Sequence, residues 1–286
     1  MTASKDHNQN ETNMQSSDGG TENPPEDSTF VVGKIPVVSD FFRALVLLSR
    51  VPVFRINDFR PALIARSVWC WPLVGLFLAG IALIPAQLAA YLTESAVVFA
   101  IVAVLALVLL TGAMHEDGLA DCADGFGGGL DRARKLEIMR DSRIGTYGVV
   151  ALVLCLGLRI ALLVRAADAG QAVVLLLVMA VVSRGVMPVL MTVLSPARDN
   201  GLGKNAGQPK WRHVMLGVAI AIATVWLLSG PVVMVSVVVA AMLATALMGG
   251  IARWQIGGQT GDVLGATQMV AELFVAIGFV ATMGNI

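Results

Sequence analysis

The sequence predicts an all-α, polytopic integral membrane protein, a bundle of about seven transmembrane helices. The composition is the first observation: 56% of the residues are hydrophobic and only 14% are charged, well below the roughly one quarter that is typical of soluble domains. The mean hydropathy of +0.76 agrees. The second observation is the length of the apolar runs, because several reach the ~20 residues that a helix needs to cross the hydrocarbon core.

The apolar runs define the expected elements in chain order. The first, DFFRALVLLSRVPVF (40–54), is short and carries two arginines, so we expect an interfacial or re-entrant helix. The transmembrane spans are expected over 68–90, 95–114, 147–165, 171–194, 213–229, 231–251 and 267–284. These elements predict a single transmembrane domain over 39–286.

Residues 1–38 differ from the rest of the chain. Their first 30 residues are polar and acidic, contain Pro, Gly and Ser, and include almost no aliphatic side chains. Such a segment buries too little apolar surface to offset the entropy of ordering, so we expect a disordered tail. It also lacks the basic stretch followed by an apolar stretch that marks a signal peptide.

The basic residues predict the orientation in the membrane. Almost all of the 20 Lys and Arg residues fall before the first span or in the loops after the second, fourth and sixth spans. Because cytoplasmic loops collect Lys and Arg, we expect a multi-pass protein of the cytoplasmic (inner) membrane with its N-terminus inside and its C-terminus outside. The polar, glycine-rich loops then share the cytoplasmic face, and we expect the functional site there.

The stretch HEDGLADCADG (115–125) is the main candidate for chemistry. Asp117, Asp121 and Asp124 follow i, i+4, i+7 spacing, which places them on one stripe of a helix. Like charges in this arrangement destabilise a helix, and a hard divalent cation such as Mg²⁺ would offset the repulsion through oxygen ligands. Asp141, in MRDSRIGTYG, is a fourth candidate metal ligand that would close the site. The alternative is a solvated acidic face.

Several other residues are candidates for substrate contacts. Glu116 points about 100° away from the stripe. Arg140 and Arg143 flank Asp141. His115 lies nearly opposite the stripe, so we expect a structural role for it. GFGGGL (125–130) is expected to end the helix.

The remaining candidates come from later segments. Arg198 and Lys204 lie in the loop SPARDNGLGKNAG (195–207) and would neutralise a diphosphate. Asp262 lies in GGQTGDVLGATQMVAE (257–272), which we expect to be a second loop and which also contains Glu272. Arg184 lies inside a predicted span, where a charge is a site candidate by default.

Taken together, these motifs resemble those of a known family. GAMHEDGLADCADGFGGGLDRARKLEIMRDSRIGTYGVVAL is similar to the signature region of cobalamin synthases, the adenosylcobinamide-GDP ribazoletransferases. Further similar stretches are FFRALVLLSRVPV, WPLVGL, SRGVMPVL with ARDNGLG, and GGQTGDVLGA. The resemblance covers nearly the whole chain after residue 38.

The resemblance implies a reaction and its partners. A hydroxyl of α-ribazole, or of its 5′-phosphate, attacks the phosphorus next to the cobinamide of adenosylcobinamide-GDP, and GMP leaves. The family uses Mg²⁺, for which Asp117, Asp121, Asp124 and Asp141 are the expected ligands and catalytic residues. Asp141 is the expected proton acceptor. The lipid bilayer, other enzymes of the same pathway and a second copy of the chain are further candidate partners; nucleic acid is not.

Two other functions are weighed against this one. CDP-alcohol phosphatidyltransferases also use aspartates at a membrane face, but their DGxxAR pattern is absent from this sequence. Cation-coupled transporters place ionisable groups near mid-bilayer in broken, repeated helices. Here most charges fall in the expected loops on one side, which favours an enzyme.

Overall fold

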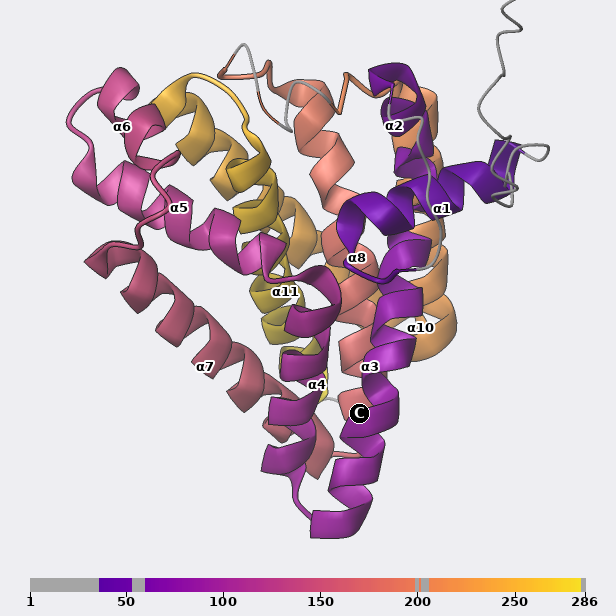
Figure 1. The fold of residues 1–286 in the computed structure, drawn as a ribbon. Helices are drawn as coiled ribbons and strands as arrows, with labels where there is room; N and C mark the ends of the chain where they lie inside the picture. Colours follow the sequence, from indigo (N-terminus) through magenta and orange to yellow (C-terminus); the bar gives the residue numbers. More distant parts are fainter. Residues whose placement is uncertain (1–35, 53–59, 199–200, 202–205, 284–286) are drawn as a thin grey trace, which may run out of the picture. The chain divides into compact units, whose positions relative to one another are not determined.

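The computed structural model describes residues 36–52, 60–198, 201 and 206–283, and all of them belong to one unit of the chain, 32–286. Among these described residues the only paired extended backbone is an isolated bridge between Pro196 and Gln259, so the all-α prediction is confirmed (Figure 1). The helices are α1 (Pro36–Leu48), α2 (Pro61–Ser67), η1 (Val68–Cys70), α3 (Trp71–Thr93), α4 (Ala96–Thr111), α5 (Met114–Gly128), α6 (Arg132–Ile138), α7 (Thr146–Asp168), α8 (Ala172–Val193), α10 (Trp211–Ile256) and α11 (Gly261–Thr282).

Helices α8 and α11 form the centre of the bundle. In each of them 72% of the most apolar window is buried, against 22% in α7 and 33% in α10. Helix α11 packs on α5, α7, α8 and α10, and α8 also packs on α3. The outer helices present apolar side chains outward, as a helix that faces lipid does.

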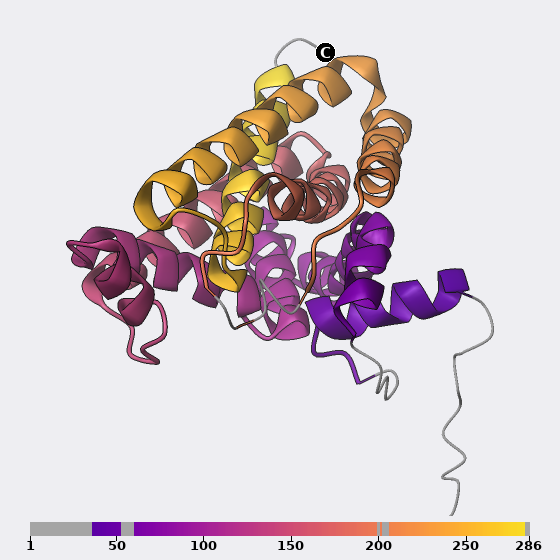
Figure 2. The ribbon, with the colours of Figure 1, turned by 90° about the horizontal axis from the view of Figure 1, so that it is seen from above.

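The exact number of seven membrane-crossing helices is not confirmed by helix length and composition. Within the described ranges, five helical stretches are long and apolar enough: α2 to α3, α7, α8, α10 and α11. The pair α4 and α5 makes a sixth if it is one broken span. This count takes Trp211–Ile256 as one stretch, although α10 consists of two helices that meet at a kink and cover the predicted spans 213–229 and 231–251. The kink is at Gly230 (φ 77°, ψ 177°), and the two arms of α10 diverge from it (Figure 2).

The acidic stretch does not simply continue from the span before it. Gly112 and Ala113 both adopt left-handed backbone, with φ of 65° and 57°, and the axes of α4 and α5 differ by 88°. The left-handed conformation has little steric cost for Gly112, which has no Cβ, whereas it has an appreciable cost for Ala113. Helix α5 therefore starts inside the bundle and runs across it (Figure 1).

The expected loop over 257–272 is wrong for most of its length. Helix α11 begins at Gly261, and the hydroxyl oxygen of Thr260 caps it by accepting the N–H of Val263 at 3.2 Å. Thr267, Gln268 and Glu272 are buried on this helix. The predicted span 267–284 already included these three residues. The hydroxyl of Thr267 donates to the carbonyl of Val263 on the same helix at 2.6 Å, and the amide of Gln268 donates to Ser183 of α8 at 3.1 Å.

The first described helix also differs from its expected bounds. Helix α1 covers Pro36–Leu48 and thus begins in the last three residues of the predicted tail; the rest of that tail lies outside the described residues. Asp40, which is 3% exposed, pairs with Arg43 at 3.1 Å and Arg66 at 2.8 Å. The indole N–H of Trp69 donates to the same carboxylate at 3.2 Å. These contacts fix α1 against α2 and η1.

The connections that carry the candidate residues gather at one end of the bundle. The turns between α3 and α4 and between α7 and α8 lie at the opposite end from α6 and from the α10–α11 connection (Figure 1). The short and the long connections are therefore separated, as the distribution of basic residues predicts.

Candidate active site

The three aspartates of the predicted stripe lie on one helix, α5. Their environments differ: Asp117 is exposed, Asp121 is half-buried and Asp124 is buried. Asp117 lies in the first turn of α5, where the exposed N–H groups of a helix favour a negative charge. The stripe therefore runs from an accessible end to a buried end.

Asp124 connects α5 to the start of α7. Its two carboxylate oxygens accept the backbone N–H groups of Gly145, at 2.7 Å, and Gly148, at 2.8 Å. These are among the N–H groups that have no partner within a helix. A Cβ on Gly148 would lie 2.5 Å from the carboxylate of Asp124, so a glycine is required for this approach. Asp124 thus caps α7.

Asp117 and Asp121 form an acidic group with a third aspartate from α11. Asp121 is repelled by Asp117 and Asp262 and attracted by Arg198. Asp117 also repels Asp262. No hydrogen bond or ion pair with another described residue holds the carboxylate of Asp117 or Asp121. These two carboxylates are therefore available to a ligand.

A close crossing of α5 and α11 brings this group together. A Cβ on Gly118 would lie 2.7 Å from the carbonyl oxygen of Asp262, so any other residue there would push the start of α11 away. The two loops predicted to carry site residues also lie side by side. The N–H of Ala197 donates to the carbonyl of Gln259 at 2.8 Å, and the N–H of Gln259 donates to that of Ser195 at 2.9 Å.

One guanidinium group, that of Arg198, stands beside the acidic group, and a second, that of Arg140, lies near Arg198. Nη1 of Arg198 lies 3.4 Å from a carboxylate oxygen of Asp262, and its Nη2 donates to the carbonyl of Leu136 at 3.2 Å. Burial lowers the pKa of Arg198 and Asp262 opposes the shift, so the group stays protonated. Arg140 lies close enough to repel Arg198. Paired guanidinium groups suit the oxygens of a phosphate.

Asp141 and Arg143 do not join this group. They pair with each other at 2.6 Å on an exposed turn. The hydrogen bond from Arg143 lowers the pKa of Asp141 to about 2 and raises the pKa of Arg143. A carboxylate with so low a pKa is a weak base at neutral pH. Lys204, the remaining predicted contact, lies outside the described residues.

A second charged cluster lies in the core and includes Glu116, the neighbour of Asp117 on α5. Arg159 of α7 pairs with Glu272 of α11 at 2.8 Å and approaches Glu116 of α5 at 3.8 Å. Arg184 of α8 lies 3.8 Å from Glu272. Each of these four side chains is at most 9% exposed. Glu116 and Arg184, which were predicted to contact substrate, are thus parts of an ion-pair network.

Sequence reasoning missed the central member of this network. Glu272 lies in both the expected loop 257–272 and the expected span 267–284 and was given no role, whereas it accepts a hydrogen bond from Gln268 at 2.6 Å and is 1% exposed. A carboxyl group one turn after Gln268, inside an apolar helix, was the available signal. His115 is also buried, at 2% exposure, and both its ring nitrogens lack a described hydrogen-bond partner.

Most of the chain matches a known protein family. The family model described as cobalamin-5-phosphate synthase matches residues 40–280. The chain belongs to this family. The matched region contains every candidate residue named above.

Curated relatives agree with the family assignment. The chain is 42% identical over 249 residues to the adenosylcobinamide-GDP ribazoletransferase of Sinorhizobium medicae, covering 82% of this chain and 94% of the relative. It is 41% identical over 253 residues to that of Azorhizobium caulinodans, covering 85% and 95%. For that of Bradyrhizobium diazoefficiens the values are 37% over 241 residues, 84% and 93%. No solved structure gives a significant match.

The donor chemistry of the acidic group fits Mg²⁺. In the described part of the chain no three His, Cys, Asp or Glu side chains converge as a ready-made metal cage. Mg²⁺ does not need one, because it usually binds through one or two carboxylates and takes its other ligands from water and substrate phosphates. Asp117 and Asp121, unpaired and one helical turn apart, provide two such oxygen donors.

Proposed function

We propose that the protein transfers α-ribazole, or its 5′-phosphate, to adenosylcobinamide-GDP with release of GMP, at the cytoplasmic face of the inner membrane. One observation carries the proposal: the family match spans 40–280, and within it unpaired acids stand beside guanidinium groups. Cleavage of a diphosphate requires charge neutralisation and positioning more than covalent chemistry by the protein. Both kinds of charge are present.

The acidic residues would bind the metal ion and the basic residues would bind the phosphates. Asp117 and Asp121, with Asp262 beside them, would hold Mg²⁺, which when bound supplies charge for the diphosphate oxygens. Arg198 and Arg140 would bind the phosphate oxygens directly. The P–O bond to the ribazole oxygen forms while the bond from that phosphorus to the bridging oxygen breaks. GMP leaves with the bridging oxygen and its electron pair, and the proton of the attacking hydroxyl is released to solvent.

Residues behind the site keep these groups in position. Asp124 holds the start of α7 against α5 through two backbone N–H groups. Glu116, Arg159 and Glu272 hold the first turn of α5 against α7 and α11. We assign them positioning roles. Asp141 as the proton acceptor stays a prediction, and its pairing with Arg143 makes it a weak base.

The test is an assay of the purified protein in detergent with adenosylcobinamide-GDP, α-ribazole and Mg²⁺. We expect equal amounts of GMP and the cobalamin product, and loss of turnover when EDTA removes Mg²⁺. A second reaction contains a CDP-lipid and an alcohol acceptor in place of these substrates. Turnover there, and none with adenosylcobinamide-GDP, would replace this proposal with a lipid synthase.

A further inference from the structure

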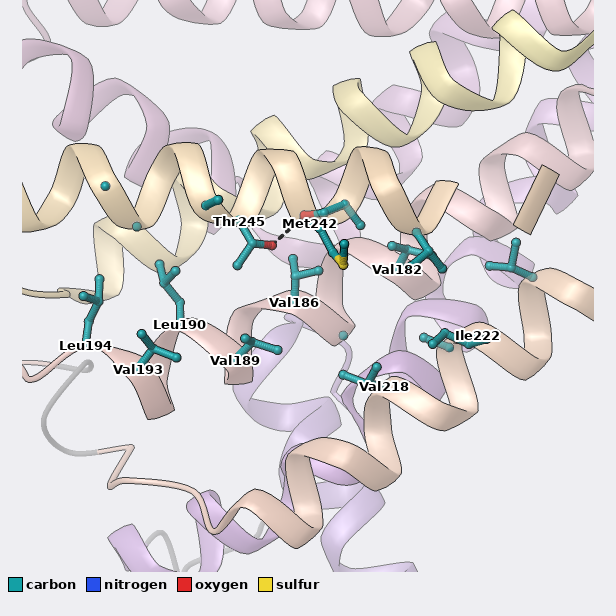
Figure 3. A pocket seen from close by; sticks show the side chains of 18 of the residues that line it. Val182, Val186, Val189, Leu190, Val193, Leu194, Val218, Ile222, Met242 and Thr245 are labelled. Carbon is teal, nitrogen blue, oxygen red and sulfur yellow. Dashed lines mark hydrogen bonds between the residues drawn. The ribbon is translucent and has the colours of Figure 1, made fainter. Parts of the chain in front are cut away.

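A cleft of about 630 Å³ lies between the two arms of α10, with α8 as its floor (Figure 3). This volume falls within the ~300–1,000 Å³ range of small-molecule sites. The cleft is separate from the acidic group. Its walls are formed by Val218 and Ile222 of the first arm, Met242 and Thr245 of the second arm, and Val186 and Val189 of α8.

The lining of the cleft is apolar along almost its whole length. Arg253 is the one charged residue among the side chains that line it. The hydroxyl of Thr245 donates to the carbonyl of Ala241 at 2.7 Å, so its donor is already used. A polar ligand would lose its hydrogen bonds to water here without replacement, and the cleft therefore favours a hydrocarbon.

The cleft is long enough to hold an acyl chain. Along the second arm it reaches from Val238 to Arg253, which is about 22 Å at 1.5 Å per residue. Val193 and Met242, both 61% exposed, lie on its open side. Since the hydrocarbon core of a bilayer is ~30 Å thick, an acyl chain that enters from the side fits within this length.

The charge lies where a lipid headgroup would be. Arg253 is exposed and lies in the last turn of α10, at the end of the bundle that carries the acidic group. The next residue, Trp254, is 81% exposed, and exposed Trp residues occur at the headgroup level of membranes. A cation at the mouth of an apolar channel complements an amphiphile with an anionic head.

We propose that this cleft binds an anionic phospholipid of the inner leaflet, with an acyl chain between the arms of α10 and its phosphate on Arg253. This inference goes beyond the catalytic proposal and does not depend on it. The bound lipid fills the space between α8 and α10.

The test compares lipid retention by the full chain and by variants, measured by native mass spectrometry after purification in detergent. The wild-type protein is expected to carry about one phospholipid per chain. Gly250 lines the cleft and has open space around it, so Gly250→Phe should fill the cleft and remove most of this lipid. Gly80→Phe is the matched control, because Gly80 is an exposed glycine of α3 with equally open surroundings.

A second pair of variants tests the headgroup contact. Arg253→Gln should weaken the binding of added phosphatidylglycerol about fivefold, the effect of one basic residue at an anionic membrane surface. Binding of phosphatidylcholine should change less, and Arg212→Gln, an exposed arginine of α10 outside the cleft, should change neither. Unchanged lipid retention in both Gly250→Phe and Arg253→Gln would overturn the proposal. So would a wild-type dimer without lipid that Gly250→Phe converts to a monomer, since the occupant would then be a second copy.

Discussion

Two charged clusters start from adjacent residues of α5 and differ in every physical respect. Glu116 is 7% exposed and belongs to the buried network with Arg159, Arg184 and Glu272. Asp117 is exposed and belongs to the acidic group with Asp121 and Asp262. In the network each acid has a basic partner. In the acidic group, Arg198 attracts Asp121, but no ion pair within 4 Å with another described residue holds Asp117 or Asp121.

The buried network therefore supports the site, and the acidic group contains the side chains that can bind a ligand. Charges in a low-dielectric interior must be paired, because removing one partner leaves a buried charge uncompensated. Acids at an accessible end of a helix can stay unpaired and repel each other, which costs stability unless a cation binds. Buried pairs therefore fix α5, α7, α8 and α11, and unpaired acids remain for ligands.

The largest expected effect comes from disrupting the buried ion-pair network. Glu272→Ala leaves Arg159 and Arg184 buried without their shared carboxylate, and should destabilise the protein by about 3–5 kcal/mol. Thermal unfolding in detergent measures this as a lower melting temperature or as loss of folded protein. A melting temperature equal to that of the wild type would show that the network does not stabilise the bundle.

Replacing an acid of the acidic group should lower turnover and leave the fold unchanged. Asp117→Asn is expected to lower kcat by about 10²–10³, the size of a lost electrostatic contact to a developing charge. The melting temperature without Mg²⁺ should stay level or rise, because a repulsion is removed. Asp168→Asn, at an exposed aspartate near the opposite end of α7, is the control and should keep full activity. Near-normal turnover of Asp117→Asn would remove the metal assignment.

Asp124 is buried like the network residues, but its partners are two backbone N–H groups and not basic side chains. In Asp124→Asn one acceptor oxygen becomes a donor that faces a backbone N–H, so at least one charge-assisted hydrogen bond is lost, at about 1.5–3 kcal/mol. Amide hydrogen exchange should rise at Gly145 and Gly148. Asp131→Asn is a milder comparison, because exposed Asp131 caps α6 by a single hydrogen bond from Arg134. Equal protection in wild type and Asp124→Asn would contradict the capping role.

The smallest effect is expected at Asp141. Its pKa is lowered from 3.8 to about 2 by Arg143, so any stabilisation from the pair is present above pH 3.8 and is lost as the pH falls through 2. Between pH 5 and 9 the pair stays ionised. Asp141→Asn should therefore give the wild-type pH–rate profile. If the wild-type rate falls on the acidic side of the profile and Asp141→Asn removes that acidic limb, Asp141 would be restored as the proton acceptor.

Much of the fold could be predicted from the sequence, because hydrophobic length alone identifies membrane-crossing helices. The runs that became α3, α7 and α8 were expected within a few residues of their observed bounds. The errors lie where polar residues enter the core. The last span was expected to start at residue 267, after a polar loop, although α11 already begins at Gly261.

The sequence predicted that aspartates and arginines form the candidate site, but not which of them lie together. The spacing of Asp117, Asp121 and Asp124 placed them on one helix, yet spacing cannot show that Asp124 accepts two N–H groups from residues 21 and 24 positions later. Nor can it show that Asp141 is paired away from the group while Asp262 joins it.

The sequence by itself determined that the chain crosses the membrane, that α5 carries three aspartates in line, and which loops carry the basic residues. These properties depend on residue type and helical periodicity, which are local. Only the tertiary structure decided which charges are paired and which are free. The bend at Gly112 and Ala113 sets the direction of α5, and the crossing at Gly118 brings α11 against it. Pairing depends on these distances of a few ångströms between residues far apart in the chain, and no local pattern encodes them.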